Sequence, residues 1–207
     1  MSPFVDYVQN IIDNRKTIKR TELADNKQVE IEVRFSRSNL DYKRVQALFN
    51  GYDKSTEKKT TEHSLGTKGV VRKRYVQETG DMEAKESICS NSFGLFSVHS
   101  TIETTHKEVL AKSQFDSDPR KKCRRSKTID GYRIDVTRVR MSGKSGWELE
   151  IEILSDSIDV PAFERVEIGL ARKTTIERAM PQAVPVVAFA PVVVADGIVS
   201  GWTKPKD

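Results

Sequence analysis

Glutamates alternate with apolar residues in two segments near opposite ends of the chain. Residues 29–35 read VEIEVRF and residues 147–153 read WELEIEI. In a β-strand, successive side chains point to opposite faces, so each segment predicts one apolar face and one charged face. The charged faces together carry five carboxylates, namely Glu30, Glu32, Glu148, Glu150 and Glu152. Carboxylate oxygens are ligands that Mg²⁺ and Mn²⁺ prefer, so these residues are candidate metal ligands.

The alternative interpretation is that the glutamates form the solvated face of half-buried antiparallel strands. Two physical arguments favour the metal. Glutamate is a poor strand residue, and three like charges at positions i, i+2 and i+4 repel one another. If the two strands are neighbours in a barrel and their charged faces point inward, the five carboxylates require a cation. Without it, burial would raise their pKa values and cost stability.

Other strand-like segments supply positive charge on one face. Arg72 shares a face with Arg74, and Lys122 shares one with Arg124. Further lumen candidates are Lys85, Arg133 and, on the same face as Arg133, Asp135 and Thr137. Facing a metal-bearing wall, such bases would complement a triphosphate, because arginine binds two phosphate oxygens at once. Taken singly, each basic pair could instead protect an exposed strand edge.

Composition is consistent with a polyanionic partner but does not select one. The chain has 207 residues with 35 Lys and Arg against 30 Asp and Glu, a net charge of +5. This length suits one domain. Cys89 and Cys123 lie far apart and there are three histidines, which argues against a zinc cluster or a disulfide framework. The start of the chain shows no signal-peptide pattern, so we expect an intracellular protein.

The order of elements predicts an α+β, mainly β fold. Helices are expected at 1–16, from Ser38 or Asn39 to Gly51, and at about 160–180. Strands are expected at 29–35, 69–76, 82–88, 95–103, 121–129, 132–140 and 147–154. Asp130-Gly131 predicts a two-residue hairpin, and residues 142–146 (SGKSG) join the next pair. A run of hairpins with this many strands predicts a closed antiparallel β-barrel.

The apolar stretch 183–199 is too short and too interrupted to cross a membrane. It contains Pro185, Pro191, Asp196 and Gly197. We expect residues 1–180 to form a single domain and 181–207 to form an extended tail of unknown role.

The glutamate motifs resemble those of the triphosphate tunnel metalloenzymes, and most closely those of the metal-dependent RNA 5′-triphosphatases that cap mRNA in fungi and large DNA viruses. The similarity begins with Glu30-x-Glu32-x-Arg34 and ends with Glu148-x-Glu150-x-Glu152. Between them, the strand ending in Glu103, the Lys122-x-Arg124 pair and Arg133-x-Asp135-x-Thr137 follow in the family's order. The similarity covers about residues 29–154, and the arginine at position 34 fits the capping branch better than the branch of adenylate cyclases and thiamine-triphosphate hydrolases.

This resemblance implies an eight-stranded tunnel, a divalent ion (Mg²⁺ or Mn²⁺) held by the five glutamates, and removal of the γ-phosphate from triphosphate-ended RNA. It implies that Glu103 orients or deprotonates the attacking water and that Asp135 positions a basic neighbour. The phosphate-holding residues would be Arg74, Lys85, Lys122, Arg124 and Arg133. Further substrate contacts are expected from Arg34, Arg72, Thr137 and Ser126. Whether Arg72 or Arg74, and Arg124 or Arg125, faces the lumen stays open at this point.

Three alternatives follow for function and partners. The same tunnel could act on inorganic tripolyphosphate or free nucleotides, or it could be a nucleotide cyclase. A catalytically silent module that binds RNA would lack a metal requirement. The resemblance implies triphosphate-ended RNA or NTP as the substrate and guanylyltransferase or methyltransferase modules as partners. It places a viral protein in the cytoplasm of an infected cell or in the virion, and a cellular one in the nucleus.

Overall fold

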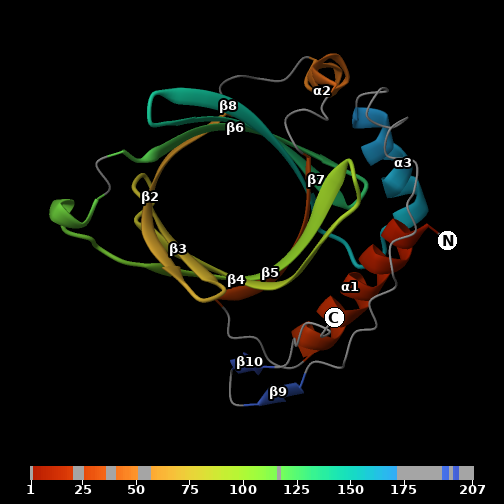
Figure 1. Ribbon diagram of the computed structural model, residues 1–207, viewed down its shortest axis with the longest axis horizontal. Helices are drawn as coiled ribbons and strands as arrows, with labels where there is room; N and C mark the ends of the chain where they lie inside the picture. Colours follow the sequence, from red (N-terminus) through yellow and green to blue (C-terminus); the bar gives the residue numbers. More distant parts are fainter. Residues whose placement is uncertain are drawn as a thin grey trace.

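Eight of the strands described by the computed structural model close into a barrel, seen end-on in Figure 1. The described residues are 2–20, 26–35, 41–50, 57–115, 118–171, 193–195 and 198–200. The barrel strands are β1 (Lys27–Phe35), β2 (Lys58–Lys68), β3 (Val71–Val76), β4 (Asp81–Ser92), β5 (Phe96–Lys107), β6 (Arg120–Ile129), β7 (Tyr132–Met141) and β8 (Lys144–Ile153).

All neighbouring strands of the barrel run antiparallel, in the order β1-β5-β4-β3-β2-β6-β7-β8. The barrel closes where β1 pairs with β8, with Glu32 opposite Glu152 and Arg34 opposite Glu150. The two glutamate-bearing strands are therefore neighbours. The predicted mainly β fold with a closed eight-stranded antiparallel barrel is confirmed.

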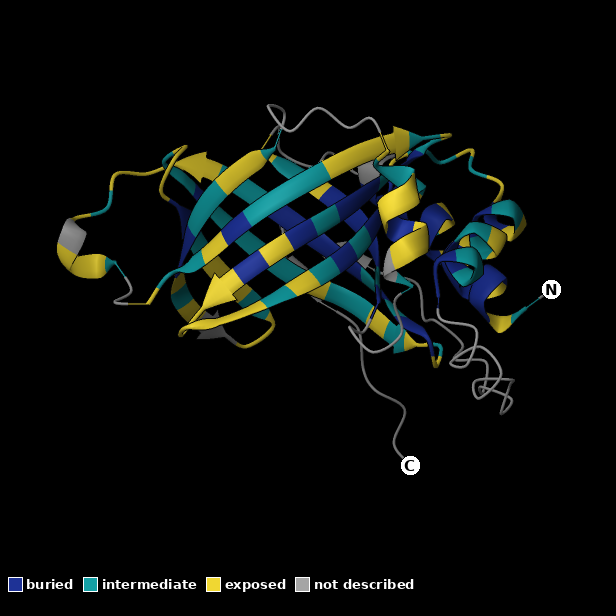
Figure 2. Ribbon diagram, turned by 90° about the horizontal axis from the view of Figure 1, so that it is seen from above, coloured by how far each residue is buried: buried dark blue, intermediate teal, exposed yellow. Residues whose placement is uncertain are grey.

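The apolar core of this protein lies outside the barrel, between the strands and the helices. Ile31, Val33, Leu149 and Ile151 are fully or almost fully buried on the outer faces of β1 and β8. Because side chains alternate along a strand, the glutamates between them point into the barrel. Figure 2 shows buried residues where the helices pack on the strands. The acidic faces are thus enclosed by the barrel wall.

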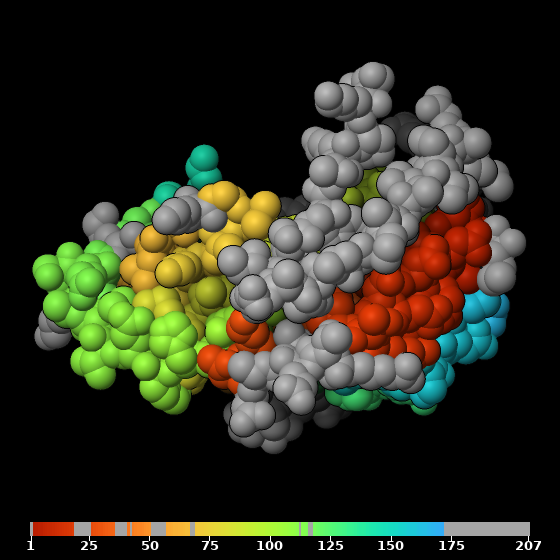
Figure 3. All heavy atoms as spheres, turned by 90° about the horizontal axis from the view of Figure 1, so that it is seen from below, coloured from red at the N-terminus to blue at the C-terminus, as the bar shows by residue number. Residues whose placement is uncertain are grey.

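Three helices cover part of the barrel: α1 (Pro3–Arg20), α2 (Tyr42–Leu48) and α3 (Val160–Leu170). Figure 3 shows α1 beside α3 at one end of the molecule, and these two helices are in contact. Phe4 of α1 packs edge-on against Phe96 of β5 and lies 6.4 Å from the ring of Phe163 in α3. Arg15 of α1 donates to the carbonyl of Ile153, 2.5 Å away, which ties α1 to the end of β8.

Each of the three helices has a boundary that differs from the sequence prediction. The second helix is capped by Asp41, whose carboxylate accepts from the N–H groups of Lys43 and Arg44, rather than by Ser38 or Asn39. The third is capped by Asp159 and ends at Leu170, because Ala171 is extended. Residues 172–180, 36–40 and 51–56 lie outside the described residues. The first helix continues to Arg20, beyond the predicted end.

The two hairpin turns that close β6–β7 and β7–β8 are each two residues long. Asp130 and Gly131 both have positive φ angles, 42° and 89°, as the predicted hairpin turn requires. Ser142 and Gly143 have φ angles of 52° and 70°. The predicted five-residue linker at 142–146 was therefore wrong: β8 begins at Lys144 and is longer than expected.

Strand β2 is absent from the sequence prediction. Its residues, KKTTEHSLGTK, place polar side chains on both faces, so the alternation of polar and apolar residues that reveals the other strands is missing. β4 and β5 also extend beyond their predicted ends.

The predicted boundary between domain and tail at 180/181 falls outside the described residues. Two short strands, β9 (Val193–Ala195) and β10 (Ile198–Ser200), pair with each other. Within the described part of the chain, no helix has both the length and the apolar character needed to cross a bilayer.

Candidate active site

The barrel encloses a cavity of about 810 Å³ whose lining is charged. Ten acidic and ten basic side chains line it among the described residues. All the predicted site residues line this cavity except Thr137 and Ser126. The charges balance, so the lumen as a whole does not strongly attract an anion. A further cation bound to the acids would give the lumen a net positive charge, which would attract a polyanion.

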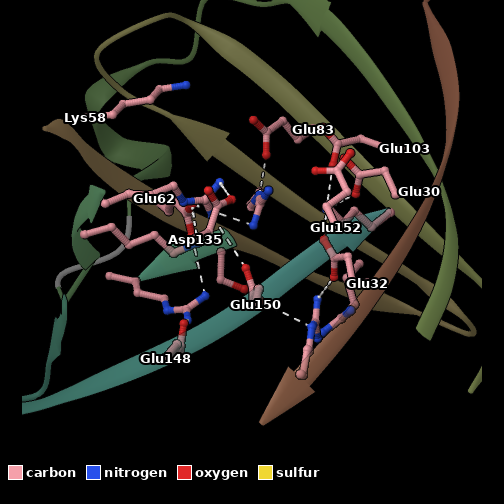
Figure 4. Close-up of a pocket in the computed structure, with 18 of the residues that line it drawn as sticks. Glu30, Glu32, Lys58, Glu62, Glu83, Glu103, Asp135, Glu148, Glu150 and Glu152 are labelled. Carbon is pink, nitrogen blue, oxygen red and sulfur yellow. Dashed lines mark hydrogen bonds and ion pairs between the residues drawn. The ribbon is translucent and has the colours of Figure 1, made fainter. Parts of the chain in front are cut away.

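At one end of the cavity, a single ammonium group holds three carboxylates. Lys85 of β4 lies 2.7 Å from Glu103 of β5 and 3.1 Å from Glu32 of β1, and it also pairs with Glu30. Figure 4 shows Glu30, Glu32 and Glu103 gathered on this side, with Glu152 close to them. The register explains the contact, because Lys85 is the direct cross-strand partner of Glu103. We call Glu30, Glu32, Glu103 and Lys85 the acidic cluster.

The acidic cluster carries more negative charge than Lys85 neutralises. Burial raises the pKa of Glu30 to about 7, and repulsion from Glu103 and Glu32 contributes despite the opposing effect of Lys85. For Glu32, burial also raises the pKa, but Lys85 and Arg34 together outweigh it and bring the pKa to about 2. Burial raises the pKa of Glu152 as well, with Glu32 adding to the rise. The site therefore has unmet demand for positive charge.

Next to this cluster, arginines alternate with the acids of β7 and β8. Arg34 pairs with Glu32 and lies 3.2 Å from Glu150. Asp135 accepts ion pairs at 3.2 Å from both Arg124 and Arg133. Arg133 also pairs with Glu152. Arg124 also lies 3.7 Å from Glu150, so each of the three arginines is fixed by two carboxylates.

A second charged cluster surrounds Glu62, which the sequence analysis missed. Glu62 lies 2.7 Å from Lys122, 3.6 Å from Arg74 and 3.7 Å from Arg120. Burial lowers the pKa of Lys122 to about 8, with Arg74 and Arg120 adding to the fall although Glu62 opposes it. Other lining residues that were not predicted include Glu83, which pairs with Arg74, and Lys58, Lys73, Asp118 and Arg120. Glu62 was missed because β2 lacks the alternation of polar and apolar residues that would have identified it as a strand.

Several buried polar atoms of the lumen wall lack a hydrogen-bond partner. They are Oδ1 of Asp135 and the hydroxyl oxygens of Thr101 and Thr137. Thr137 is 1% exposed and follows Asp135 on the same face of β7. A buried unsatisfied polar group costs about 1–3 kcal/mol, and of these three residues only Asp135 lines the cavity, where a polar ligand would satisfy it.

The open choices between neighbouring basic residues are settled by the lining of the cavity. Arg72 and Arg74 both line it. Arg124 lines it too, whereas Arg125 faces outward and pairs with Glu57 at 2.5 Å. Ser126 is exposed and lies outside the lining, although it is the cross-strand partner of Asp135, so its predicted substrate contact stays a prediction.

The chemistry of the acidic cluster suits a hard divalent ion, but the carboxylates are not arranged around one. Their oxygens are the donors that Mg²⁺ and Mn²⁺ prefer, and Glu30, Glu32 and Glu103 already bind a cation, the ammonium of Lys85. As arranged, no three carboxylate, histidine or cysteine side chains of the described residues are positioned to hold a metal. Of the five predicted ligands, Glu148 pairs with Arg120 instead, away from Glu30 and Glu32.

Comparisons with known proteins agree with the architecture. No protein-family model matches the sequence, and no curated protein matches it. The solved structure of the Mimivirus capping enzyme triphosphatase is 18% identical, with a TM-score of 0.51 over 85% of this chain and 100% of that chain. The S. pombe Pct1 RNA triphosphatase, solved in complex with the Spt5 CTD, is 13% identical over 84% of this chain and 88% of that chain, with a TM-score of 0.49. Together with the closed barrel, the Mimivirus similarity shows that this chain shares the fold of that triphosphatase.

Proposed function

We propose that this protein hydrolyses the γ-phosphate from the 5′-triphosphate end of RNA, leaving a diphosphate end, as the first step of mRNA capping. The observation that carries the proposal is the enclosed lumen in which acidic and basic side chains alternate around one cavity. A surface strand pair would not enclose ten bases with ten acids. The fold shared with the Mimivirus capping enzyme triphosphatase supports the same reaction class.

We propose Mg²⁺ or Mn²⁺ as the cofactor, held by Glu30, Glu32, Glu150 and Glu152, with Glu148 acting through its pairing partners. The ion would neutralise charge on the phosphate oxygens and so stabilise the transition state of phosphoryl transfer. Lys85 and Arg34 pair with these carboxylates, and a bound ion that neutralised the acids would leave both bases available to the substrate.

The residues of this chain then divide the remaining work. Arg74, Lys122, Arg124 and Arg133 hold phosphate oxygens, and arginine does so with two parallel hydrogen bonds. Asp135 fixes both Arg124 and Arg133, because its Oδ2 lies 3.2 Å from a guanidinium nitrogen of each. Glu103 orients the attacking water and accepts its proton, a role for which its place in the acidic cluster suits it. Arg72 and Arg34 contribute further substrate contacts, whereas the buried Thr137 does not line the cavity.

Comparison of three substrates tests the reaction. Phosphate release is measured from RNA with a labelled 5′-triphosphate end, from a free nucleoside triphosphate and from inorganic tripolyphosphate, each with and without manganese. We expect the highest kcat/KM for the RNA. A preference for tripolyphosphate or nucleotide would assign a small-molecule triphosphatase, and formation of a cyclic nucleotide would assign a cyclase. RNA binding without any hydrolysis in manganese would refute enzymatic function and assign an RNA-binding module.

We propose guanylyltransferase and methyltransferase modules as partners, because a diphosphate RNA end is the substrate that a guanylyltransferase requires. Co-purification of a guanylyltransferase with the tagged full chain tests this pairing.

A further inference from the structure

The outer wall of the barrel carries exposed bases on three adjacent strands. Lys59 of β2 and Arg138 of β7 are both cross-strand partners of Cys123 in β6, and Lys121 of β6 is the partner of Arg140 in β7. All four bases are exposed and lie on the face opposite the lumen residue Lys122. Since neighbouring strands lie about 4.8 Å apart, the four charges form one compact group. We call these four residues the outer basic surface.

The outer basic surface differs from the lumen in that its bases make no close ion pair, although Lys59 lies near enough to Glu57, and Lys121 to Asp118, to lower the pKa values of these two carboxyls. None of the salt bridges within the described residues involves Lys59, Lys121, Arg138 or Arg140. By contrast, Lys85, Lys122 and Arg34 in the lumen each pair with at least one carboxylate. Unpaired bases clustered on one face attract a polyanion.

An aromatic side chain connects this surface with the mouth of the cavity. Trp147 of β8 is the cross-strand partner of Arg138, is 37% exposed and lines the cavity. Met141 lines the same mouth and is 51% exposed. The turn between β7 and β8 is held in place because the N–H of Ser142 donates to Asp118 at 3.0 Å. Trp147 therefore stands on a fixed rim where a chain leaving the lumen would meet the outer basic surface.

We propose that Trp147 and the outer basic surface bind the single-stranded RNA that follows the triphosphate end. A base stacks on Trp147, and the phosphates beyond it contact the four bases. This inference rests on the proposed function, which places the 5′ end in the lumen, and it names the part of the substrate that a small triphosphate lacks. The exposed tryptophan among unpaired bases favours RNA over an acidic protein, because stacking and phosphate contacts together are typical of single-strand binding.

The test measures binding of RNA without a triphosphate. A fluorescent 20-nucleotide single strand with a 5′-hydroxyl end is titrated with the full chain at several salt concentrations, and anisotropy is recorded. The variant Lys121→Gln/Arg138→Gln/Arg140→Gln should bind at least about tenfold more weakly. The slope of log K against log salt should fall by about 2, since each phosphate contact to a single strand contributes about 0.7. Trp147→Ala should bind about tenfold more weakly with the salt slope unchanged.

The matched control is Lys43→Gln/Arg165→Gln, which removes two exposed bases from α2 and α3, away from the outer basic surface. If the control loses as much affinity and salt slope per charge as the triple variant, the RNA is held by general charge and the inference is overturned. The inference is also overturned if polyglutamate of the same charge binds the wild type as tightly as the RNA does and binds the triple variant more weakly, because the surface then docks an acidic protein.

Kinetics separate this inference from the proposed function. In the triple variant, the KM for a triphosphate-ended 20-mer should rise about tenfold relative to the KM for inorganic tripolyphosphate. An unchanged ratio overturns the RNA surface while leaving the triphosphatase intact. If the wild-type chain binds the 5′-hydroxyl RNA through these residues but releases no γ-phosphate from the triphosphate-ended 20-mer, the proposed function alone is refuted.

Discussion

Replacing Lys85 with methionine isolates the electrostatics of the acidic cluster. Methionine keeps most of the length of the lysine stem but removes the charge that Glu30, Glu32 and Glu103 share. The side chain of Lys85 is 12% exposed, and those of the three glutamates are between 7% and 11% exposed, so water does little to screen the carboxylates from one another. Removing one partner of a buried ion pair costs about 3–5 kcal/mol, because an uncompensated buried charge remains.

A loss of this size is large enough to measure by thermal unfolding. In a chain of this length, 1 kcal/mol shifts Tm by about 2–4 °C, so Lys85→Met should lower Tm by about 6–20 °C in EDTA. A divalent ion should replace the missing ammonium. At a manganese concentration a hundred times Kd, binding stabilises the fold by about 2.7 kcal/mol, which corresponds to a recovery of about 5–11 °C. Manganese should raise Tm less in the wild type, where Lys85 competes for the same oxygens.

Circular dichroism melts in EDTA, MgCl₂ and MnCl₂ provide the assay. The control is Lys107→Gln, whose side chain is 74% exposed and pairs with Asp81 at the surface; it should change Tm by no more than about 2 °C and show no added response to manganese. If Lys85→Met and the wild type have the same Tm in EDTA, or if manganese raises the Tm of both proteins equally, the three carboxylates do not form a shared cation site.

Two further substitutions test other buried acids. Glu62→Gln removes the carboxylate that holds Lys122 and Arg74, so we expect a loss of about 1.5–3 kcal/mol of stability and at least a tenfold fall in kcat/KM. The control is Glu108→Gln, which changes an exposed glutamate. A wild-type kcat/KM in Glu62→Gln would show that Glu62 does not position these bases. Glu167 of α3 is fully buried with both oxygens unpaired, and burial raises its pKa well above the usual range. Its neutral form is favoured by folding, so the stability it contributes is complete below the unfolded pKa of about 4.5 and is lost as pH rises toward the folded pKa. Glu167→Gln should therefore raise Tm at pH 8 and flatten its pH dependence between pH 5 and 8, as differential scanning calorimetry can measure; an equal pH dependence in both proteins would show that Glu167 is not the source.

The sequence predicted the barrel wherever one face of a strand was apolar. β1 and β8 read as strict alternations because their outer faces pack under the helices and their inner faces line the lumen. The same alternation would arise from a solvated face, so only the closure of β1 on β8 shows that the glutamates are enclosed. β2 escaped detection because polar residues occupy both of its faces, including His63, which is buried against Phe115, and Glu62 was missed with it.

Ion-pair partners within the site could not be read from spacing along the chain. Lys85 contacts the acidic cluster because the β4–β5 register places it opposite Glu103 and the barrel brings β1 alongside. Likewise, Glu148 was grouped with the other glutamates by its spacing, but it lies beyond the residues of β8 that pair with β1 and contacts Arg120 instead. Registers and tilt are set by closure of the whole barrel, which no local pattern encodes.

The most direct test of the enzyme is release of labelled γ-phosphate from triphosphate-ended RNA, with the wild type compared with Glu32→Ala and Glu150→Ala. We expect the wild type to hydrolyse the RNA in manganese, EDTA to abolish this activity, and each variant to lose at least about a hundredfold in rate. A folded Glu32→Ala or Glu150→Ala protein with the wild-type rate at saturating manganese would contradict the assignment of these carboxylates to the metal.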